Sequence, residues 1–314
     1  NLVVASAAWL PDHPLLQAQR ARYLRWQDAI AGAAPQPHAT VSVVLPSYRH
    51  AAFVAQAIAS VRAQTRPPDE LIVIDDGSGD DSVAIIGAAL ADCPIPHRVV
   101  SRSNRGADVT LNEAIAMASG DWIAPLNSDD AYDPARLATL LAACAREGID
   151  WGFGGVDIVD ASGQALARGN EITGKLYAVH DALHMSEALS LAFLRGNPAI
   201  STGNLFFRKS LWQRVGGFAP LRYNHDWAFC LAASMHAEPV WVPAARYRYR
   251  WHGGNTIGDS RIAPQREAAA MMQQFVARAC VTPDRAERWQ AFAPCATGWG
   301  LAFWTMLAAG GRVQ

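Results

Sequence analysis

The sequence has almost no net charge and no paired cysteines. Its 314 residues include 27 basic and 28 acidic side chains, for a formal net charge of −1. This balance gives no electrostatic reason to expect a nucleic acid as partner. The five cysteines are scattered and never form a C-x-x-C pair. Their pattern argues against a zinc site or a disulfide framework, and it fits a reducing compartment such as the cytoplasm.

Long hydrophobic runs are also lacking. The apolar stretch 298–310 is shorter than the roughly 20 residues that span a bilayer. It predicts a core or docking helix; the alternative is a peripheral membrane contact with Trp299 and Trp304 at the headgroups. Residues 2–10 are apolar but lack a basic leader, which argues against a signal peptide. We therefore expect a cytoplasmic protein that is at most associated with a membrane surface.

A glycine-rich phosphate loop is absent as well. The β-branched run 41–46 predicts a buried first strand, and a Rossmann dehydrogenase would place G-x-G-x-x-G directly after it. Residues 47–50 read Ser-Tyr-Arg-His instead, and no Walker loop occurs elsewhere. A phosphate site must therefore be made differently. Carboxylates that hold Mg²⁺ or Mn²⁺ against a diphosphate are the obvious means.

What the first half does contain is an alternation of strands and helices. Predicted strands at 41–46, 71–74, 98–100 and 122–126 alternate with predicted helices at 52–63, 82–90 and 108–118. This order predicts a parallel sheet with right-handed crossovers. Nucleotide-binding α/β domains have this organisation.

The second half is mixed, and we expect it to continue the same sheet. A hairpin is predicted over 151–166, strands over 204–208, 240–242 and 247–251, and helices over 134–146, 186–194 and 226–235. Further helices are predicted at 15–30, 262–281 and 285–292. Arginines 246, 248 and 250 alternate with aromatic residues, which is typical of a strand with one basic face. That face is expected to be a solvated edge, with a diphosphate or acceptor contact as the alternative.

Acidic pairs follow two of the predicted strands. Asp75 and Asp76 come after the second strand, and Asp129 and Asp130 come after the fourth. Ligands of open α/β sheets bind at the carboxyl ends of the strands, so Asp129 and Asp130 are candidates for a metal-bound diphosphate site.

Each acidic motif also has a simpler explanation when taken alone. Asp75 to Ser78 would form a turn with a helix cap. The pair Asp129 and Asp130 would be a helix-start cluster favoured by the dipole. Asp226 would be an N-cap, and His252 a loop histidine with its hydrogen bonds satisfied.

Taken in order, the motifs resemble family 2 of the inverting glycosyltransferases, which have a GT-A fold. The resemblance covers roughly 40–257. The matching elements are Val43–Tyr48, Ile74–Ser78, Asn104–Gly106, Asn112, Gly120–Asp121, Asn127–Asp130, Gly203–Asn204, Gly216–Phe218, His225–Trp227 and Tyr249–Thr256.

The resemblance implies the fold class and the domain organisation. The fold would be α/β of the GT-A type: a Rossmann-like, mostly parallel sheet flanked by helices, with a mixed second half and C-terminal helices. Residues 1–40 would form an N-terminal helical extension, and 258–314 a C-terminal helical segment. Between them, the GT-A domain 41–257 would consist of a nucleotide-binding half, 41–130, and an acceptor half, 131–257.

The resemblance also implies roles for individual residues. Asp226 would be the general base, and Asp129, Asp130 and His252 would hold Mn²⁺ or Mg²⁺. The residues expected to bind the nucleotide-sugar donor are Pro46, Ser47, Tyr48, Asp76, Asn104, Gly106, Asn127 and Asp129. Two positions depart from the family pattern. Asn127 stands at the first acid of the D-x-D motif, and Leu111 stands where the family often has an arginine.

The function implied is metal-dependent, inverting transfer of a sugar from a nucleoside diphosphate, with UDP favoured, to a hydroxyl acceptor. A glycan or lipid-linked acceptor of cell-surface polysaccharide biosynthesis is expected by analogy. One alternative is a nucleotidyltransferase that makes the activated sugar, which would need a glycine-rich basic loop after the first strand. The other is a non-catalytic nucleotide-sugar-binding module.

Overall fold

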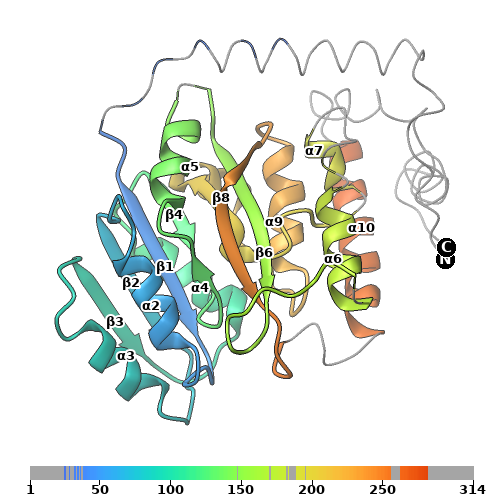
Figure 1. Ribbon diagram of the computed structural model, residues 1–314. Helices are drawn as coiled ribbons and strands as arrows, with labels where there is room; N and C mark the ends of the chain where they lie inside the picture. The colour runs from blue at the N-terminus through green and yellow to red at the C-terminus, as the bar shows by residue number, and fades with distance from the viewer. Residues whose placement is uncertain are drawn as a thin grey trace.

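In the computed structural model, the eight strands among the described residues lie in one sheet (Figure 1). The structure describes residues 38–255, except 147, 170, 182, 184–188 and 195, together with 262–281 and a few isolated positions between 25 and 36. The strand order is β3-β2-β1-β4-β7-β6-β8-β5. The strands are β1 (Val41–Ser47), β2 (Glu70–Asp75), β3 (His97–Ser101), β4 (Trp122–Pro125), β5 (Ala131–Tyr132), β6 (Trp151–Val159), β7 (Leu205–Arg208) and β8 (Val240–Arg250).

The first half of the sheet is parallel, as predicted. Strand β1 pairs in parallel with β2 and with β4, and β2 pairs in parallel with β3. The second half continues the same sheet in mixed order. Strand β7 is antiparallel to β4 and β6, β8 is parallel to β6, and the short β5 is antiparallel to β8. The predicted fold class, a parallel first half and a mixed second half in one sheet, is confirmed.

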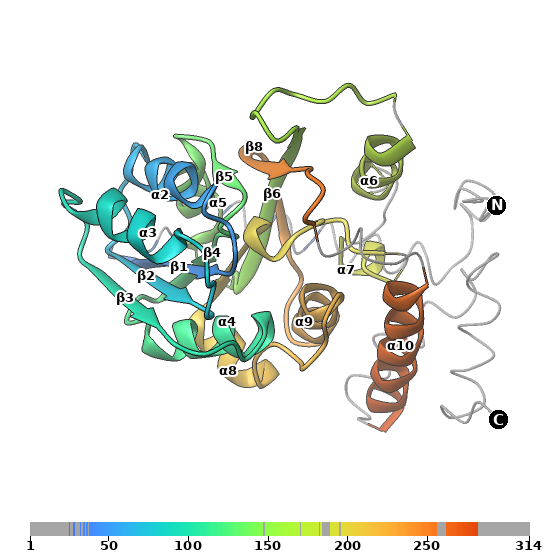
Figure 2. The ribbon, with the colours of Figure 1, turned by 90° about the horizontal axis from the view of Figure 1, so that it is seen from below.

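Helices cover both faces of the sheet (Figure 2). On one face, apolar side chains of α2, α3 and α5 pack in a single buried cluster. On the other, a second cluster joins α4, α8, α9 and α10 to the sheet. The helices are α2 (Val54–Arg62), α3 (Ser82–Leu90), α4 (Ala107–Met117), α5 (Arg136–Cys144), α6 (Glu171–Asp181), α7 (Leu189–Ala192), α8 (Lys209–Val215), α9 (His225–Ser234) and α10 (Ala263–Val281).

Several elements differ from the sequence prediction. The two strands predicted at 240–242 and 247–251 are one strand, β8, which pairs with β6 across an irregularity between Gly154 and Val156. Helices α6 and α8 were not predicted. The hairpin after β6 consists of one bridge, between Val159 and Ala165. The helices predicted at 15–30 and 285–292 and the apolar stretch 298–310 lie wholly or largely outside the described residues.

A carboxylate on α10 holds the start of α9. Glu267 accepts hydrogen bonds of 2.8 Å from the backbone amides of Arg222, Tyr223 and Asn224, and one of 3.0 Å from the side chain of Asn224. The unpaired amides ahead of a helix favour a negative charge there. Helix α10 is thereby fixed to α9 by polar contacts as well as by the apolar cluster. In the described part of the chain, no helix is both long and apolar enough to cross a membrane.

Candidate active site

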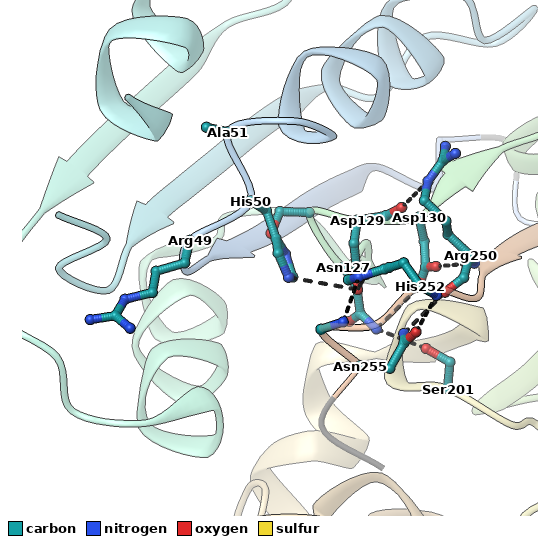
Figure 3. A network of polar contacts seen from close by, with 12 residues as sticks. Arg49, His50, Ala51, Asn127, Asp129, Asp130, Ser201, Arg250, His252 and Asn255 are labelled. Carbon is teal, nitrogen blue, oxygen red and sulfur yellow. Dashed lines mark hydrogen bonds and ion pairs between the residues drawn. The ribbon is translucent and has the colours of Figure 1, made fainter. Parts of the chain in front are cut away.

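Three loops at the carboxyl edge of the sheet meet at one point (Figure 3). His50 lies after β1, Asp129 lies after β4, and His252 lies after β8. One ligand atom from each of these side chains lies within 4.8 Å of the others. The topology therefore gathers residues from distant parts of the chain, as expected for the carboxyl ends of parallel strands.

Asp129 is the centre of this group. Its Oδ2 atom lies 3.1 Å from Nε2 of His252 and 3.8 Å from Nε2 of His50. His50 also contacts the hydroxyl of Ser128 through Nδ1 at 2.8 Å. Asp129 and His252 were both expected here, whereas His50 was not. The signal that was available is its position directly after the first strand.

The histidines keep Asp129 ionised. Burial alone would raise the pKa of this carboxyl, but the hydrogen bond from His252 and the charges of His50 and His252 lower the pKa below its ordinary value. An ionised carboxylate flanked by two imidazoles can bind a divalent cation, because all three groups offer ligand atoms when deprotonated.

Asp130 faces away from this group, contrary to its predicted support of the cation. It accepts hydrogen bonds from the Tyr247 hydroxyl at 2.5 Å, the Arg250 amide at 2.7 Å and the Asn127 side chain at 3.2 Å. Its exposed fraction is 1%. Burial and the neighbouring charge of Asp129 raise the pKa of Asp130 well above its ordinary value. The two residues lie in a turn after β4, closed by a 3.1 Å hydrogen bond from the amide of Asp130 to the carbonyl of Asn127, and only Asp129 reaches the cluster.

Two further residues explain why Asp130 can be held this way. Gly203 packs against the ring of Tyr247, where a Cβ atom would lie 1.9 Å from the hydroxyl. Arg250 donates to the backbone oxygens of Asp129 at 2.7 Å and Ala161 at 2.9 Å, and also contacts the side chain of Gln56. Arg250 is 2% exposed, so the predicted solvated edge is wrong at this end of β8.

The arginines at the other end of β8 match the expectation better. Arg246 and Arg248 pair with Asp157 and Asp133, and the side chains of all four are at least about one-third exposed. The alternating pattern therefore marks a partly solvated face only until the strand passes beneath the loop that carries Asp129.

Asp226 lies in the first turn of α9. It accepts a 2.8 Å hydrogen bond from Asn197 and a 2.7 Å bond from the amide of Trp227. Burial raises the pKa of Asp226, and the nearby His225 offsets part of that effect. His225 in turn contacts Thr202 at 3.1 Å. A buried carboxyl with a raised pKa and its orientation fixed by an amide is suited to accept a proton.

One short segment connects the two acidic sites. Asn197 bonds to Asp226, and four residues later Ser201 accepts a 2.9 Å hydrogen bond from the side chain of Asn127. Asn127 thus uses its amide nitrogen to join the D-x-D loop to this segment. Its predicted contact with the donor stays a prediction.

The predicted base and ribose pocket lies at the ends of β1 and β2. Pro46 and Ser47 end β1; Tyr48 follows with 40% of its surface exposed. Asp76 is buried and accepts hydrogen bonds from the amides of Arg105 at 2.8 Å and Gly106 at 2.9 Å, and from the guanidinium of Arg102.

These contacts leave room for the predicted donor contact of Asp76. A carboxylate has about four acceptor sites, so the three bonds of Asp76 leave one for a nucleotide base. The loop that carries Asp76 packs tightly against the loop that carries Asn104: a Cβ atom on Gly77 would lie 2.8 Å from the amide nitrogen of Asn104. The loop after β2, with Asp76, and the loop after β3, with Asn104 and Gly106, therefore pack against each other.

Strained backbone flanks both sides of the candidate site. Among the described residues, Arg49 and Ile200 are the non-glycine residues with positive φ, at 54° and 69°. Each stands immediately before a residue of the site, His50 or Ser201. Such strain costs about 1–3 kcal/mol per residue and is concentrated at functional sites.

An open groove of about 730 Å³ lies apart from this cluster, between α4 and α8. It is lined by Arg105, Val109, Asn112, Glu113, Trp212, Gln213, Gly216 and Gly217. None of the three residues around the candidate cation position borders it. We assign it no part in the chemistry described here.

Solved structures with a similar fold include two that hold a nucleotide sugar. Staphylococcus aureus TarS, crystallised with UDP-GlcNAc, aligns with a TM-score of 0.60 and 16% identity over 82% of this chain and 71% of that one. The mannosyltransferase PcManGT of Pyrobaculum calidifontis, in complex with GDP-Man and Mn²⁺, aligns with a TM-score of 0.55 and 19% identity over 96% of this chain and 86% of that one. At these identities the likeness concerns the fold.

Sequence relatives point the same way. An uncharacterized glycosyltransferase of Nostoc sp., alr2836, is 26% identical over 68% of this chain and 66% of its own length. The succinoglycan biosynthesis protein ExoO of Rhizobium meliloti is 28% identical over 55% of this chain and 47% of its own. The chain thus spans just under two thirds of the first relative and about half of the second.

The family itself is identified by residues 42–216, which match the model of glycosyl transferase family 2 over 175 of the 314 residues. This stretch contains most of the motifs that carried the sequence resemblance. The chain belongs to glycosyl transferase family 2, as the order of its motifs predicted.

Proposed function

We propose that this chain is a metal-dependent, inverting glycosyltransferase that uses a nucleoside-diphosphate sugar. Support comes from one relationship above all. The segment 197–204 contacts both acidic sites: Asn197 bonds to Asp226 directly, and Ser201 bonds to Asn127 in the loop that carries Asp129. The pKa of Asp129 is lowered, whereas the pKa of Asp226 is raised. Carboxyls whose environments push their pKa values apart are typical of a site with two distinct chemical roles.

Asp226 is the proposed general base. Its carboxylate takes the proton of the acceptor hydroxyl while that oxygen attacks the anomeric carbon. The bond between the anomeric carbon and the diphosphate oxygen breaks on the opposite face, so the configuration inverts and the nucleoside diphosphate leaves. Asn197 fixes the carboxylate orientation, and burial keeps its basicity high.

Asp129 and His252 are the proposed holders of Mn²⁺ or Mg²⁺. The fit rests on the donor set: an ionised carboxylate oxygen and an imidazole nitrogen 3.1 Å apart at the carboxyl edge of the sheet. When bound there, the cation would neutralise negative charge on the departing diphosphate. Asp130 contributes by holding the loop in place, through the contacts of its two oxygens.

The donor is proposed to be a UDP-sugar, in a pocket formed by residues 46–48, 76, 104 and 106. The structural relatives are consistent with a nucleotide sugar, since TarS was crystallised with UDP-GlcNAc and PcManGT with GDP-Man. The acceptor is proposed to be a glycan or lipid-linked precursor of a polysaccharide, as the name of the relative ExoO suggests. A cytoplasmic location with peripheral membrane contact belongs to the same proposal.

A donor screen tests this function. The purified chain is incubated with UDP-, GDP- and TDP-sugars, with and without Mn²⁺, and release of the free nucleoside diphosphate is measured. We expect release from one donor class that depends on Mn²⁺ and is lost in Asp226→Asn. Calorimetric donor binding without release or transfer to any acceptor would instead support a non-catalytic binding module.

A further inference from the structure

We infer that His50 is a third protein ligand of the cation, so that the chain binds the metal before the nucleotide arrives. The inference rests on the proposed metal site for its cation, but concerns a residue and an order of binding that the proposed function does not include. It is carried by three observations: the distances around Asp129, the hydrogen bonds that orient His50 and His252, and the packing that fixes both rings.

The distances place three ligand atoms around one position. Two ligands about 2.1 Å from a cation lie about 3.0 Å apart when adjacent and about 4.2 Å apart when opposite. Oδ2 of Asp129 is 3.1 Å from Nε2 of His252 and 3.8 Å from Nε2 of His50. The whole set lies within 4.8 Å. Adjustments of less than about 1 Å would therefore bring all three into one coordination sphere.

The hydrogen bond of His50 suits a metal ligand. Its Nδ1 atom lies 2.8 Å from the Ser128 hydroxyl, which can accept the ring proton and leave the lone pair of Nε2 directed toward Asp129. Ligating histidines commonly donate their other nitrogen in this way. Ser128 precedes Asp129, so one loop both supplies a ligand and orients another.

Nε2 of His252 faces the same carboxylate oxygen of Asp129 as Nε2 of His50 does. Nδ1 of His252 accepts a hydrogen bond of 3.1 Å from the amide of Gly254, and its Nε2 lies 3.1 Å from Oδ2 of Asp129. A cation held there would replace the direct contact between His252 and Asp129.

Phe53 holds the two imidazoles at their present spacing. Its ring centroid lies 4.6 Å from that of His252 and 6.1 Å from that of His50, and the two imidazole centroids are 5.8 Å apart. On another side of Phe53, the guanidinium of Arg250 lies 5.2 Å from the ring. The rings are therefore preorganised by packing.

A site with two imidazoles and one carboxylate has consequences for the choice of metal and for the order in which cation and nucleotide bind. Imidazole ligands favour Mn²⁺ and Co²⁺ over Mg²⁺, which prefers oxygen. Three protein ligands from separate loops leave open positions for diphosphate oxygens and water. They also make cation binding independent of the nucleotide, because the protein alone supplies half or more of the contacts needed to hold the ion.

The test measures Mn²⁺ binding to the full chain without nucleotide. Binding is detected as a loss of the free-ion signal in electron paramagnetic resonance. We expect one Mn²⁺ per chain, and at least about tenfold weaker binding in His50→Ala. His97→Ala is the matched control, because His97 begins the exposed edge strand β3. This variant should bind Mn²⁺ like the unmutated chain. Mg²⁺ should displace Mn²⁺ only at large excess.

A second readout separates ligation from folding. Co²⁺ absorption bands report directly on the ligands, and they should change in His50→Gln, which keeps a polar side chain of similar reach.

Unchanged Mn²⁺ affinity and unchanged Co²⁺ bands in both His50 variants would overturn the inference. An unmutated chain that binds Mn²⁺ only with UDP would overturn it as well. Weakened UDP binding with normal Mn²⁺ binding would instead make His50 a donor contact. Tight Mn²⁺ binding without any sugar transfer would count against the proposed function alone.

Discussion

The hydroxyl of Tyr247 donates a 2.5 Å hydrogen bond to Asp130, joining residues 117 positions apart. Both side chains are buried, so the bond is sheltered from water. Tyr247→Phe should leave one oxygen of Asp130 short of a donor and lower the free energy of unfolding by about 1–3 kcal/mol. Urea denaturation measures this loss, and Mn²⁺ affinity should stay close to that of the unmutated chain.

Tyr249→Phe is the matched control for this prediction. Tyr249 lies two residues further along β8, is also largely buried, and its hydroxyl has no hydrogen-bond partner among the residues that the structure describes. Tyr249→Phe should lower the free energy of unfolding by less than Tyr247→Phe does. A large loss of Mn²⁺ affinity in Tyr247→Phe would instead indicate that Asp130 takes part in binding the cation.

Asp226→Asn should separate stability from activity. Only the ionised carboxylate accepts a proton, so turnover of the unmutated chain should rise with pH through the raised pKa of Asp226. The asparagine variant should lose about 10²- to 10⁴-fold in kcat. Nucleotide binding, followed by calorimetry, should persist.

Stability should have the opposite pH dependence at Asp226. Because burial raises its folded-state pKa, the folded chain binds more protons here than the unfolded chain does. Its stabilising contribution is therefore complete below the unfolded pKa of about 3.9 and is lost as pH rises through the folded pKa. Urea midpoints measured across the acid range should fall less with pH in Asp226→Asn. Parallel curves for the two chains would contradict the raised pKa.

Asn197 is expected to act as a positioning residue through Asp226. Asn197→Asp puts a second negative charge 2.8 Å from the base, which should raise the pKa of Asp226 further. The pH–rate profile should shift to higher pH, while KM for the donor stays nearly constant. A purely structural role would lower activity equally at every pH.

Two replacements of Arg49 should differ in stability because of its backbone conformation. Its φ of 54° lies in the left-handed region, which asparagine tolerates far better than alanine. Both Arg49→Asn and Arg49→Ala lose the contact with the Tyr48 ring, 5.1 Å from the guanidinium. The asparagine variant should therefore be more stable than the alanine variant by about 1 kcal/mol in urea denaturation. Equal stabilities would show that the loop relaxes.

Much of the fold could be predicted because buried parallel strands leave a local signal. The apolar runs at 41–46 and 71–74 coincide with β1 and β2 within one residue at each end. Asp129, Asp226 and His252 could be found because each follows a strand or opens a helix within a motif. Short helices such as α8 lack a full period of apolar spacing and were missed.

The remaining errors concern direction and distance. Neighbouring carboxylates look equivalent in a sequence, yet Asp129 faces two histidines while Asp130 faces Tyr247. The position of His50 after the first strand places it at the carboxyl edge of the sheet, but it does not show that His50 lies beside residues 79 and 202 positions away. Alternation along β8 likewise cannot show that Arg250, unlike Arg246, passes under a loop and becomes buried.

Glu267 bears on where the working unit of this protein ends. The family match stops at residue 216, before the proposed base, and the predicted domain boundary falls at 257. A chain shortened to that boundary would lose the carboxylate that three amides ahead of α9 share. Helix α9 would then start one turn later or tilt, and Asp226 in its first turn would lose its alignment. The smallest fragment able to keep its base in place therefore extends beyond residue 257 into α10.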